Sequence, residues 1–266
     1  MKTKVKLYIA AVVVALVVVA LVYNTYFANL NAPLSSYDGR AVDVGTYLQL
    51  RSIASNQTLA NIVGSGVIPT SSYPVYISGN LLVLNGKPGV LYVGAEYCPF
   101  CAAGRWGLLL ALMRFGDFST LHYMTSSASD IFGSTPTFTF YNSTYNSSYI
   151  SFDSAETQTN TYTPLQQLNP EENITFHTYD TSGIPFMDFG NKSIQSGSDF
   201  SPGIIWSPHY NWQQIIALLS QPNSTASQAI IGSADVLTAQ ICQEDNFTPT
   251  DVCSAHYIKP ILAAMH

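Results

Sequence analysis

The feature that most constrains the fold is a pair of cysteines placed where an apolar strand is expected to meet a helix. Residues 90–94 form an uninterrupted apolar run that is typical of a buried strand. The sequence Glu-Tyr-Cys-Pro-Phe-Cys follows directly and contains Cys98 and Cys101. Apolar side chains then recur at helical spacing over residues 106–113. With a further strand predicted over residues 121–124, the order strand, helix, strand predicts a right-handed parallel crossover.

Weaker patterns predict the remaining elements. A helix is expected over residues 42–55, and residues 81–84 form a short strand closed by an Asn-Gly turn. Alternation over residues 137–140 and 149–152 predicts a hairpin that projects from the domain. A strand entered through a proline is predicted at residues 183–190, and helices over residues 212–219, 226–243 and 255–265.

A cysteine at the start of a helix has a chemical advantage. The helix dipole favours its thiolate, which is the nucleophile in disulfide exchange. Cys98 is therefore the expected nucleophile, and we expect its side chain to be exposed. Cys101, one turn further on, is the expected resolving cysteine. Pro99 suits the first helical turn because it has no amide to leave unpaired.

Three other uses of this motif compete with exchange chemistry. A zinc site needs four ligands, and the five histidines show no ligand spacing. Haem attachment needs a histidine after the second cysteine, where Ala102 stands. A static structural disulfide remains open for a protein in an oxidising compartment. Exchange chemistry is favoured, with no metal and no cofactor.

The N-terminus predicts an address outside the cytoplasm. Three lysines precede an apolar run, residues 7–23, and a membrane-spanning helix needs about 20 mostly apolar residues. We expect residues 1–30 to be a single-pass transmembrane signal anchor, with the lysines inside and the C-terminal domain outside the cell membrane. A cleaved signal peptide is the alternative, with a poor cleavage site after Ala20.

The composition agrees with an exterior location. Charged residues make up 10% of the chain and the net charge is −6, which argues against a nucleic-acid partner because phosphate binding needs clustered cations. Hydrophobic residues reach 47%, enough for a core, so uncharged polar groups must cover the surface. Because few surface ion pairs would be lost on protonation, we expect the fold to persist in acid. Seven Asn-x-Ser/Thr acceptors are candidate glycosylation sites: Asn56, Asn142, Asn146, Asn173, Asn191, Asn223 and Asn246.

The strand, the cysteine motif, the helix and the later segment Gly183-Ile184-Pro185 together resemble a thioredoxin-type domain. In that superfamily a cis-proline loop faces the Cys-x-x-Cys motif, and the residue before the proline offers its backbone to the partner peptide. The resemblance implies that Pro185 joins Cys98 and Cys101 as a catalytic residue, with Ile184 in support. The Cys-Pro-Phe-Cys sequence is similar to those of glutaredoxins and DsbA-type oxidants.

Three further segments sharpen the resemblance. Residues 94–102, 135–141 and 184–190 are similar to segments of an archaeal membrane-anchored thioredoxin-like family, the domain of unknown function 929. That likeness covers most of residues 40–266. Tyr97 stands where thioredoxins place a tryptophan, and a long polar insertion precedes Pro185.

The expected fold class is therefore α/β, a thioredoxin-like mixed sheet flanked by helices, with an inserted hairpin region and a C-terminal helical segment. The expected parts are the anchor (1–30), a tether and short helix (31–70) and an ectodomain (71–266) with an insertion (126–180) and a disulfide-stapled helical part (223–266). The residues expected to support the motif are Glu96, Tyr97, Pro99, Phe100 and Ile184. Glu96 is either a proton relay to Cys101 or a solvated strand-end residue.

The second cysteine pair is expected to be structural. A disulfide between Cys242 and Cys253 would restrain a loop between two helices, with a stabilisation of roughly 2 to 3 kcal/mol. Exchange of electrons with the first pair is the alternative. The expected function is that of a membrane-anchored thiol-disulfide oxidoreductase, resembling an oxidase or isomerase, whose partners are exported protein thiols and a redox protein that recycles the site. The alternative is a non-enzymatic surface-binding module in which Cys98 and Cys101 form a structural bond.

Overall fold

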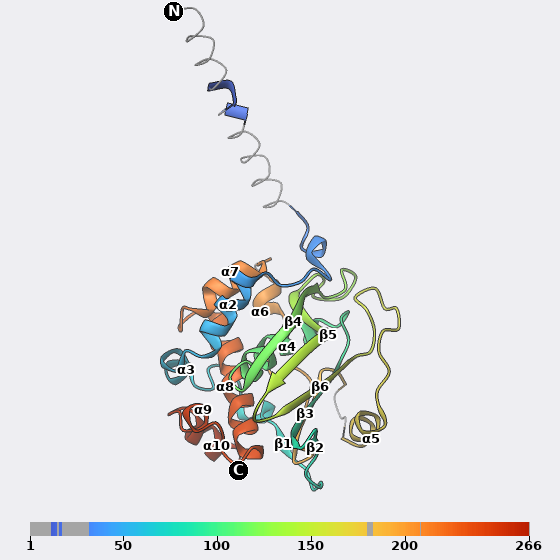
Figure 1. Cartoon of the computed structure of the whole chain (residues 1–266), viewed down its shortest axis with the longest axis vertical. Coiled ribbons are helices and arrows are strands. Elements are labelled where there is room, and N and C mark those ends of the chain that lie inside the picture. The colour runs from blue at the N-terminus through green and yellow to red at the C-terminus, as the bar shows by residue number, and fades with distance from the viewer. Residues whose placement is uncertain (1–11, 15, 18–31, 180–182, 208, 266) are drawn as a thin grey trace, which may run out of the picture. The chain divides into compact units, whose positions relative to one another are not determined.

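Strand β3 (Lys87–Gly94) leads directly into the cysteine motif and lies centrally in a mixed six-stranded sheet (Figure 1). Its last six residues are buried, as the apolar run predicts. Strand β3 pairs parallel with β6 (Ser151–Glu156) and antiparallel with β7 (Phe186–Phe189). The sheet continues from β7 through β8 (Ser193–Ser196) to β1 (Val75–Tyr76), and β2 (Val83–Leu84) pairs with the start of β3.

A two-residue turn joins β2 to β3 at the position that the sequence predicts. Asn85 and Gly86 have φ angles of +51° and +78°. Both angles lie in the left-handed region that a type I′ hairpin turn requires and that Asn-Gly favours.

Strand β4 (Gly116–Thr125) and strand β5 (Pro136–Ser147) form a separate antiparallel sheet. The predicted parallel crossover from residues 90–94 to residues 121–124 is therefore wrong. The strand that follows the motif helix pairs with its own hairpin partner, and the parallel neighbour of β3 is β6.

The hairpin predicted between residues 137–140 and 149–152 is also wrong. The first segment belongs to β5, which pairs with β4, whereas the second leads into β6 in the main sheet. Phe138 and Phe140 are buried. This part of the expected insertion, 126–180, is therefore core rather than a projection.

Helix α4 (Pro99–Leu112) carries the motif and is buried throughout, except at Phe100. It packs closely against helix α8 (Thr225–Glu244), because a Cβ on Gly107 would lie 2.1 Å from Ser233 Oγ. Only a residue without a side chain permits this approach.

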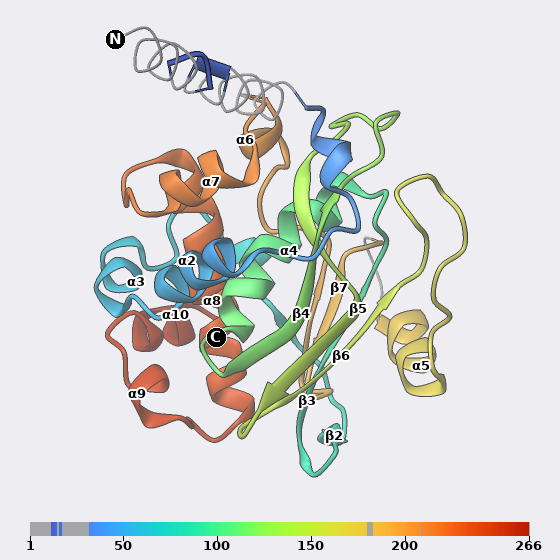
Figure 2. The ribbon, with the colours of Figure 1, turned by 45° about the horizontal axis from the view of Figure 1, so that its top comes forward.

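The other helices lie around the strands. In Figures 1 and 2, helices α2, α3, α7, α8, α9 and α10 gather on one side and α5 lies on the other. Four predicted helices are confirmed: α2 (Val44–Ala54), α7 (Trp212–Leu219), α8 and α10 (Ile258–Ala264). The sequence did not predict α3 (Gln57–Val63), α5 (Pro170–Tyr179), α6 (Gly203–Trp206), α9 (Thr250–Cys253) or the 3-10 turns η1 (Leu34–Tyr37) and η2 (Thr70–Ser72).

The C-terminal cysteines form the predicted disulfide. Cys242, near the end of α8, is bonded to Cys253 in α9, with their Cα atoms 5.5 Å apart. The bond ties the final short helices to the long helix that packs on α4.

The computed structural model describes residues 12–14, 16–17, 32–179, 183–207 and 209–265, and the chain divides into two units, residues 1–36 and 37–266. In the first unit, residues 12–14 and 16–17 are helical. The rest of the predicted anchor lies outside the described residues. Within the described ranges, no helix is long and apolar enough to cross a membrane.

Candidate functional site

Cys98 is the residue that caps the start of α4. Its backbone is extended, and its Sγ accepts a hydrogen bond from the backbone N–H of Cys101 at 3.2 Å. Pro99 occupies the first helical turn. The sulfur therefore lies at the positive end of the helix, where a thiolate is stabilised.

The loop before β7 brings Pro185 to the same place. The Ile184–Pro185 peptide bond is cis, as predicted, and the Ile184 carbonyl oxygen lies 3.8 Å from Cys98 Sγ. On the other side of the loop, a Cβ on Gly104 would lie 3.2 Å from Pro185 Cγ. The proline thus packs on α4 while the preceding carbonyl faces the sulfur.

The two thiols differ in their environments. Cys98 is 6% exposed and Cys101 is 0% exposed. A hydrogen bond with the Cys101 side chain lowers the pKa of Cys98, helped by the Cys101 N–H and the charge of Arg105 and opposed by burial. Burial raises the pKa of Cys101 well above its usual value. The expectation that Cys98 is exposed is wrong, because the Pro185 loop covers it, but the lowered pKa of Cys98 agrees with the expected preference for its thiolate.

A buried ion pair that the sequence analysis missed lies behind the motif. Arg105 donates to Glu156 through Nε at 2.8 Å and through Nη2 at 2.7 Å, and both side chains are fully buried. Nη2 also donates to the Ala95 carbonyl oxygen at 2.7 Å. The sequence contained one indication of this ion pair. Arg105 lies four residues after Cys101, on the apolar side of a buried helix, and a buried cation needs a partner.

Glu96 is buried, so the alternative of a solvated residue at the end of a strand is wrong. Its side chain is 4% exposed and accepts a hydrogen bond from Thr139 Oγ1 at 2.7 Å. Burial raises the pKa of this carboxyl group. Together with His122 and Tyr141 it lines a cavity of about 290 Å³. A role as proton relay to Cys101 stays a prediction.

Aromatic side chains surround the entrance to the motif. Tyr97 stacks on Tyr162 with ring centroids 4.5 Å apart, and Phe100 meets Phe132 edge-on at 6.1 Å. Phe100 and Tyr162 are both 42% exposed, and the nearby Ile131 in the same loop as Phe132 is 72% exposed. This rim exposes apolar surface beside the motif.

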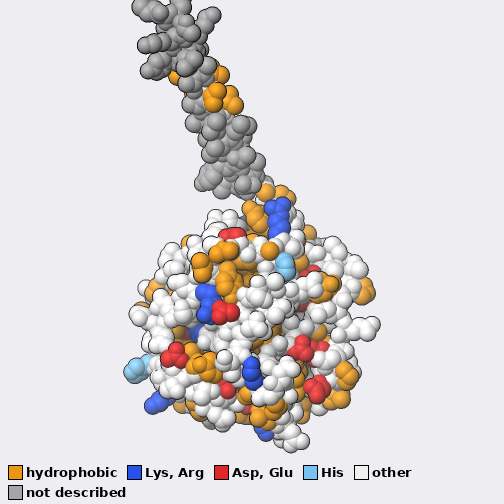
Figure 3. Space-filling view, viewed as in Figure 1, with side chains coloured by type: hydrophobic (Ala, Val, Ile, Leu, Met, Phe, Trp, Pro, Cys, Tyr) orange, Lys and Arg blue, Asp and Glu red, His pale blue; other side chains and the backbone are white. Residues whose placement is uncertain are grey.

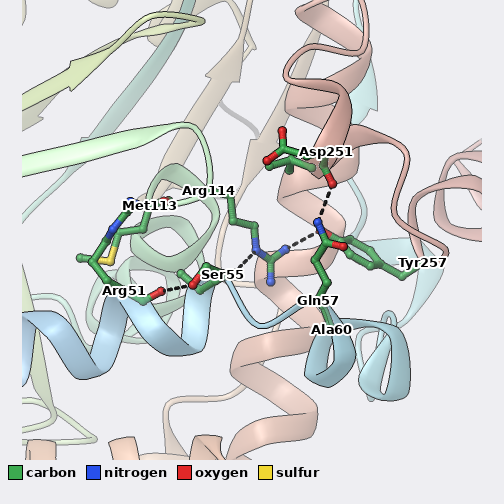
Figure 4. Close-up of a pocket in the computed structure, with 10 residues that line it drawn as sticks. Arg51, Ser55, Gln57, Ala60, Met113, Arg114, Asp251 and Tyr257 are labelled. Carbon is green, nitrogen blue, oxygen red and sulfur yellow. Dashed lines mark hydrogen bonds between the residues drawn. The ribbon is translucent and has the colours of Figure 1, made fainter.

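A second cavity, of about 200 Å³, lies between α2, the end of α4 and α9 (Figure 4). Its two arginines are already engaged. Arg51 donates to the carbonyl oxygens of Met113 and Gly116, at the end of α4. Arg114 bonds to Ala54 O at 3.0 Å, to Tyr257 Oη at 3.0 Å, and to Asp235 at 2.6 Å. Both arginines therefore have partners near the C-terminal end of α4. No residue of the cysteine motif lines this cavity.

Six of the seven predicted glycosylation asparagines are exposed: Asn56, Asn142, Asn146, Asn173, Asn223 and Asn246. Asn191 is half-buried, and its Nδ2 donates to Asn80 O at 2.9 Å. A glycan on Asn191 would replace one of the two Nδ2 hydrogens at this half-buried position. Among the described residues, no group of three or more His, Cys, Asp or Glu side chains could hold a metal ion.

Comparison with known proteins gives one family. No curated protein and no solved structure matches the chain. Residues 73–179 match the model of the family described as Domain of unknown function (DUF929). This range contains the cysteine motif, the β4–β5 hairpin and β6, and ends before Pro185. Over residues 73–179, the chain is therefore similar to the DUF929 family.

Proposed function

We propose that the chain is a thiol-disulfide oxidoreductase that resembles thioredoxin-type proteins. Cys98 is the nucleophile and Cys101 the resolving cysteine. The observation that carries the proposal is the position of Cys98 Sγ between the Cys101 N–H and the Ile184 carbonyl oxygen, at 3.2 and 3.8 Å. The Cys101 N–H stabilises the thiolate. The backbone of Ile184 lies beside the sulfur and can bind a substrate strand.

The arrangement of the core supports the thioredoxin-like part of the proposal. The central strand β3 enters the motif, α4 follows, and the proline loop enters β7, which is antiparallel to β3. The two segments that meet at Cys98 are therefore ends of neighbouring strands.

The proposed exchange transfers two electrons. A substrate thiolate attacks Cys98 Sγ of the oxidised protein, the Cys98–Cys101 bond breaks, and Cys101 leaves as a thiolate that takes up a proton. A second substrate thiolate then attacks the substrate sulfur of the mixed disulfide. Cys98 leaves as a thiolate, the substrate gains a disulfide and the protein is reduced. The lowered pKa of Cys98 favours this direction, because a stabilised thiolate stabilises the reduced protein.

The sequence of the first 30 residues and the composition of the surface support a location outside the cytoplasm. We propose a single-pass membrane protein whose domain acts outside the cytoplasm on exported proteins, with a separate redox partner that reoxidises it. The face in Figure 3 shows few, scattered charges among uncharged polar and apolar side chains. Such a surface suits unfolded polypeptides of varied charge better than a strongly charged ligand.

The direct test is electron transfer to a reduced, unfolded protein that contains cysteines. The oxidised full-length chain is expected to remove two substrate thiols per molecule, measured by counting free thiols. Cys98→Ser is expected to remove none. The double variant Cys242→Ser/Cys253→Ser, folded at the assay temperature, should keep the transfer. Transfer that survives Cys98→Ser, or no transfer by the parent chain, would contradict the proposal.

Pro185→Ala is expected to slow this transfer about tenfold, because the loop that places the Ile184 carbonyl beside Cys98 loses its packing on Gly104. Pro249→Ala is the matched control, since Pro249 is the other cis proline among the described residues and lies beside the C-terminal disulfide. Equal slowing by both substitutions would show that Pro185 acts only on stability.

A further inference from the structure

Two buried hydrogen-bond donors lie behind the cysteine motif with no acceptor among the described residues. One is the hydroxyl group of Tyr92, a β3 residue that is 0% exposed. The other is Nη1 of Arg105, also 0% exposed. Leaving a buried donor unpaired destabilises a fold, so each such donor calls for an explanation.

The surroundings hold both groups in place. The hydroxyl of Tyr92 lies against the backbone of Gly94, where an added Cβ would be 2.2 Å away. The Arg105 guanidinium lies over the Tyr92 ring, 5.9 Å from its centroid. Its other two nitrogens are fixed by Glu156 and by the Ala95 carbonyl. The orientation of the third nitrogen is therefore fixed, although it has no partner in the described ranges.

The same two residues interact electrostatically with the thiols. Arg105 lies one turn beyond Cys101 on α4, and its charge lowers the pKa of Cys101 and of Cys98, against the dominant effect of burial on Cys101. Burial raises the pKa of Tyr92. The negative charges of Cys101, Glu156 and Cys98 raise it further, and Cys101 has the largest effect of the three. The position of Arg105 one turn beyond Cys101 on α4, with its guanidinium over the Tyr92 ring, places both residues near Cys101.

A purely structural role does not account for the hydroxyl group. A phenylalanine at position 92 would fill the same volume without burying an unpaired donor. By contrast, the hydroxyl of Tyr145 in β5 donates to the Leu112 carbonyl oxygen at 2.8 Å and has a structural purpose.

We propose that Tyr92 Oη and Arg105 Nη1 donate hydrogen bonds to the Cys101 thiolate when Cys101 resolves a mixed disulfide. This inference rests on the proposed function. In that step, the Cys101 thiol gives its proton to water or hydroxide, and its sulfur attacks Cys98 Sγ. The Cys98–Cys101 bond forms, the bond from Cys98 to the bound sulfur breaks, and the departing thiolate takes up a proton from solvent. The cysteine pair is oxidised and the departing group is reduced.

The test uses the reduced full-length chain and a chromogenic aryl disulfide. Attack by Cys98 releases one coloured arylthiolate and leaves the other half bound to Cys98. Attack by Cys101 then releases the second. At an aryl disulfide concentration that makes the first release faster than the second, the two releases separate in time. The pH dependence of the second then reports the ionisation of Cys101 without that of Cys98.

Tyr92→Phe is expected to leave the first release unchanged and to slow the second about tenfold near neutral pH, a loss of about 1.4 kcal/mol. The pH midpoint of the second release should rise by about one unit. The thermal unfolding midpoint should not fall, because the lost hydroxyl has no partner within the part of the chain that the structure describes. Arg105 is not substituted, because its loss would leave Glu156 buried without its cation.

Tyr145→Phe is the matched control, with the same chemical change near the far end of α4. It is expected to lower the unfolding midpoint and to leave both releases unchanged. A second release with parental rate and pH midpoint in Tyr92→Phe would overturn the inference while leaving the proposed function intact. If the parent chain releases only one arylthiolate, the proposed function fails and the inference fails with it.

Discussion

A Cys101→Ser variant is expected to accumulate as mixed disulfides through Cys98 in membranes of cells that express the full-length chain. Cys98 has the lowered pKa and attacks first, and the variant then lacks the neighbouring sulfur that would release the partner. Because the lost step is intramolecular, release should slow by about three orders of magnitude or more. Non-reducing electrophoresis should show adducts that a reductant abolishes, and mass spectrometry should identify the linked cysteine as Cys98.

The matched control is Cys98→Ser. It retains Cys101, which is 0% exposed and has a raised pKa, so trapping should be absent. Equal adducts from both variants would show that neither cysteine has a distinct role. Absence of adducts from Cys101→Ser would contradict the assignment of Cys98 as nucleophile.

The folded chain is expected to become more stable as the pH falls from 7 to 5. Burial raises the pKa of Asp188 to about 6, partly offset by the Asn191 N–H, and raises that of Asp199 to about 6. Burial likewise raises the pKa of the half-buried Glu244 to about 7. The ordinary aspartate value is 3.8.

The direction of this pH dependence follows from the number of protons that the folded and unfolded chains bind. Between pH 4 and pH 6, the folded chain holds protons on these aspartates that the unfolded chain has lost. Lowering the pH therefore favours folding; the stabilisation is complete below about pH 4 and is lost as the pH rises through 6. A rise of about two pKa units in one buried carboxyl corresponds to roughly 3 kcal/mol. The unfolding midpoint should thus rise by an amount on the order of 10 °C between pH 7 and pH 5.

The double variant Asp188→Asn/Asp199→Asn is the control, because an amide resembles the protonated carboxyl group in shape. Its midpoint should be higher than that of the parent at pH 7, and it should change less between pH 7 and pH 5. Thermal unfolding followed by circular dichroism measures both. A parental midpoint that falls over this range, or a variant that keeps the full pH dependence, would contradict the account and the expected acid tolerance.

The sequence predicts the motif and its immediate surroundings because these are local. The short apolar run before Cys98 is typical of a buried strand, and Pro99 is typical of the first turn of a helix. The Asn-Gly turn at residues 85–86 requires left-handed backbone, which few other residue pairs adopt. The position of Pro185 against Cys98 followed from the resemblance rather than from any local pattern.

The pairing of the later strands could not be predicted, because it depends on contacts distant in sequence. Residues 137–140 and 149–152 alternate in the same way and lie close together in sequence, which favours a hairpin between them. Strand β4 competes for the first segment, with a register that runs from Gly116–Ser147 to Thr125–Pro136. The second segment is then free to pair with β3, which buries Ala155 and Glu156.

The chemistry behind the motif was hidden for the same reason. Glu156 ends a strand that is 51 residues away from Arg105 in sequence. No spacing rule connects them, so the partner that a buried Arg105 needs cannot be identified from the sequence. Only the parallel pairing of β6 with β3 brings the carboxylate under α4, where it fixes the guanidinium beside Cys101.

The measurement that tests the central claim most directly is a redox titration of the full-length chain in glutathione buffers, with free thiols counted after quenching and unfolding. Cys98 and Cys101 are expected to titrate as one two-electron couple at a potential above about −270 mV. The Cys242–Cys253 bond should stay oxidised to below about −300 mV, as structural disulfides do. Joint reduction of both pairs below about −300 mV, or failure of Cys98 and Cys101 to form a disulfide at any potential, would contradict an exchange function for this site.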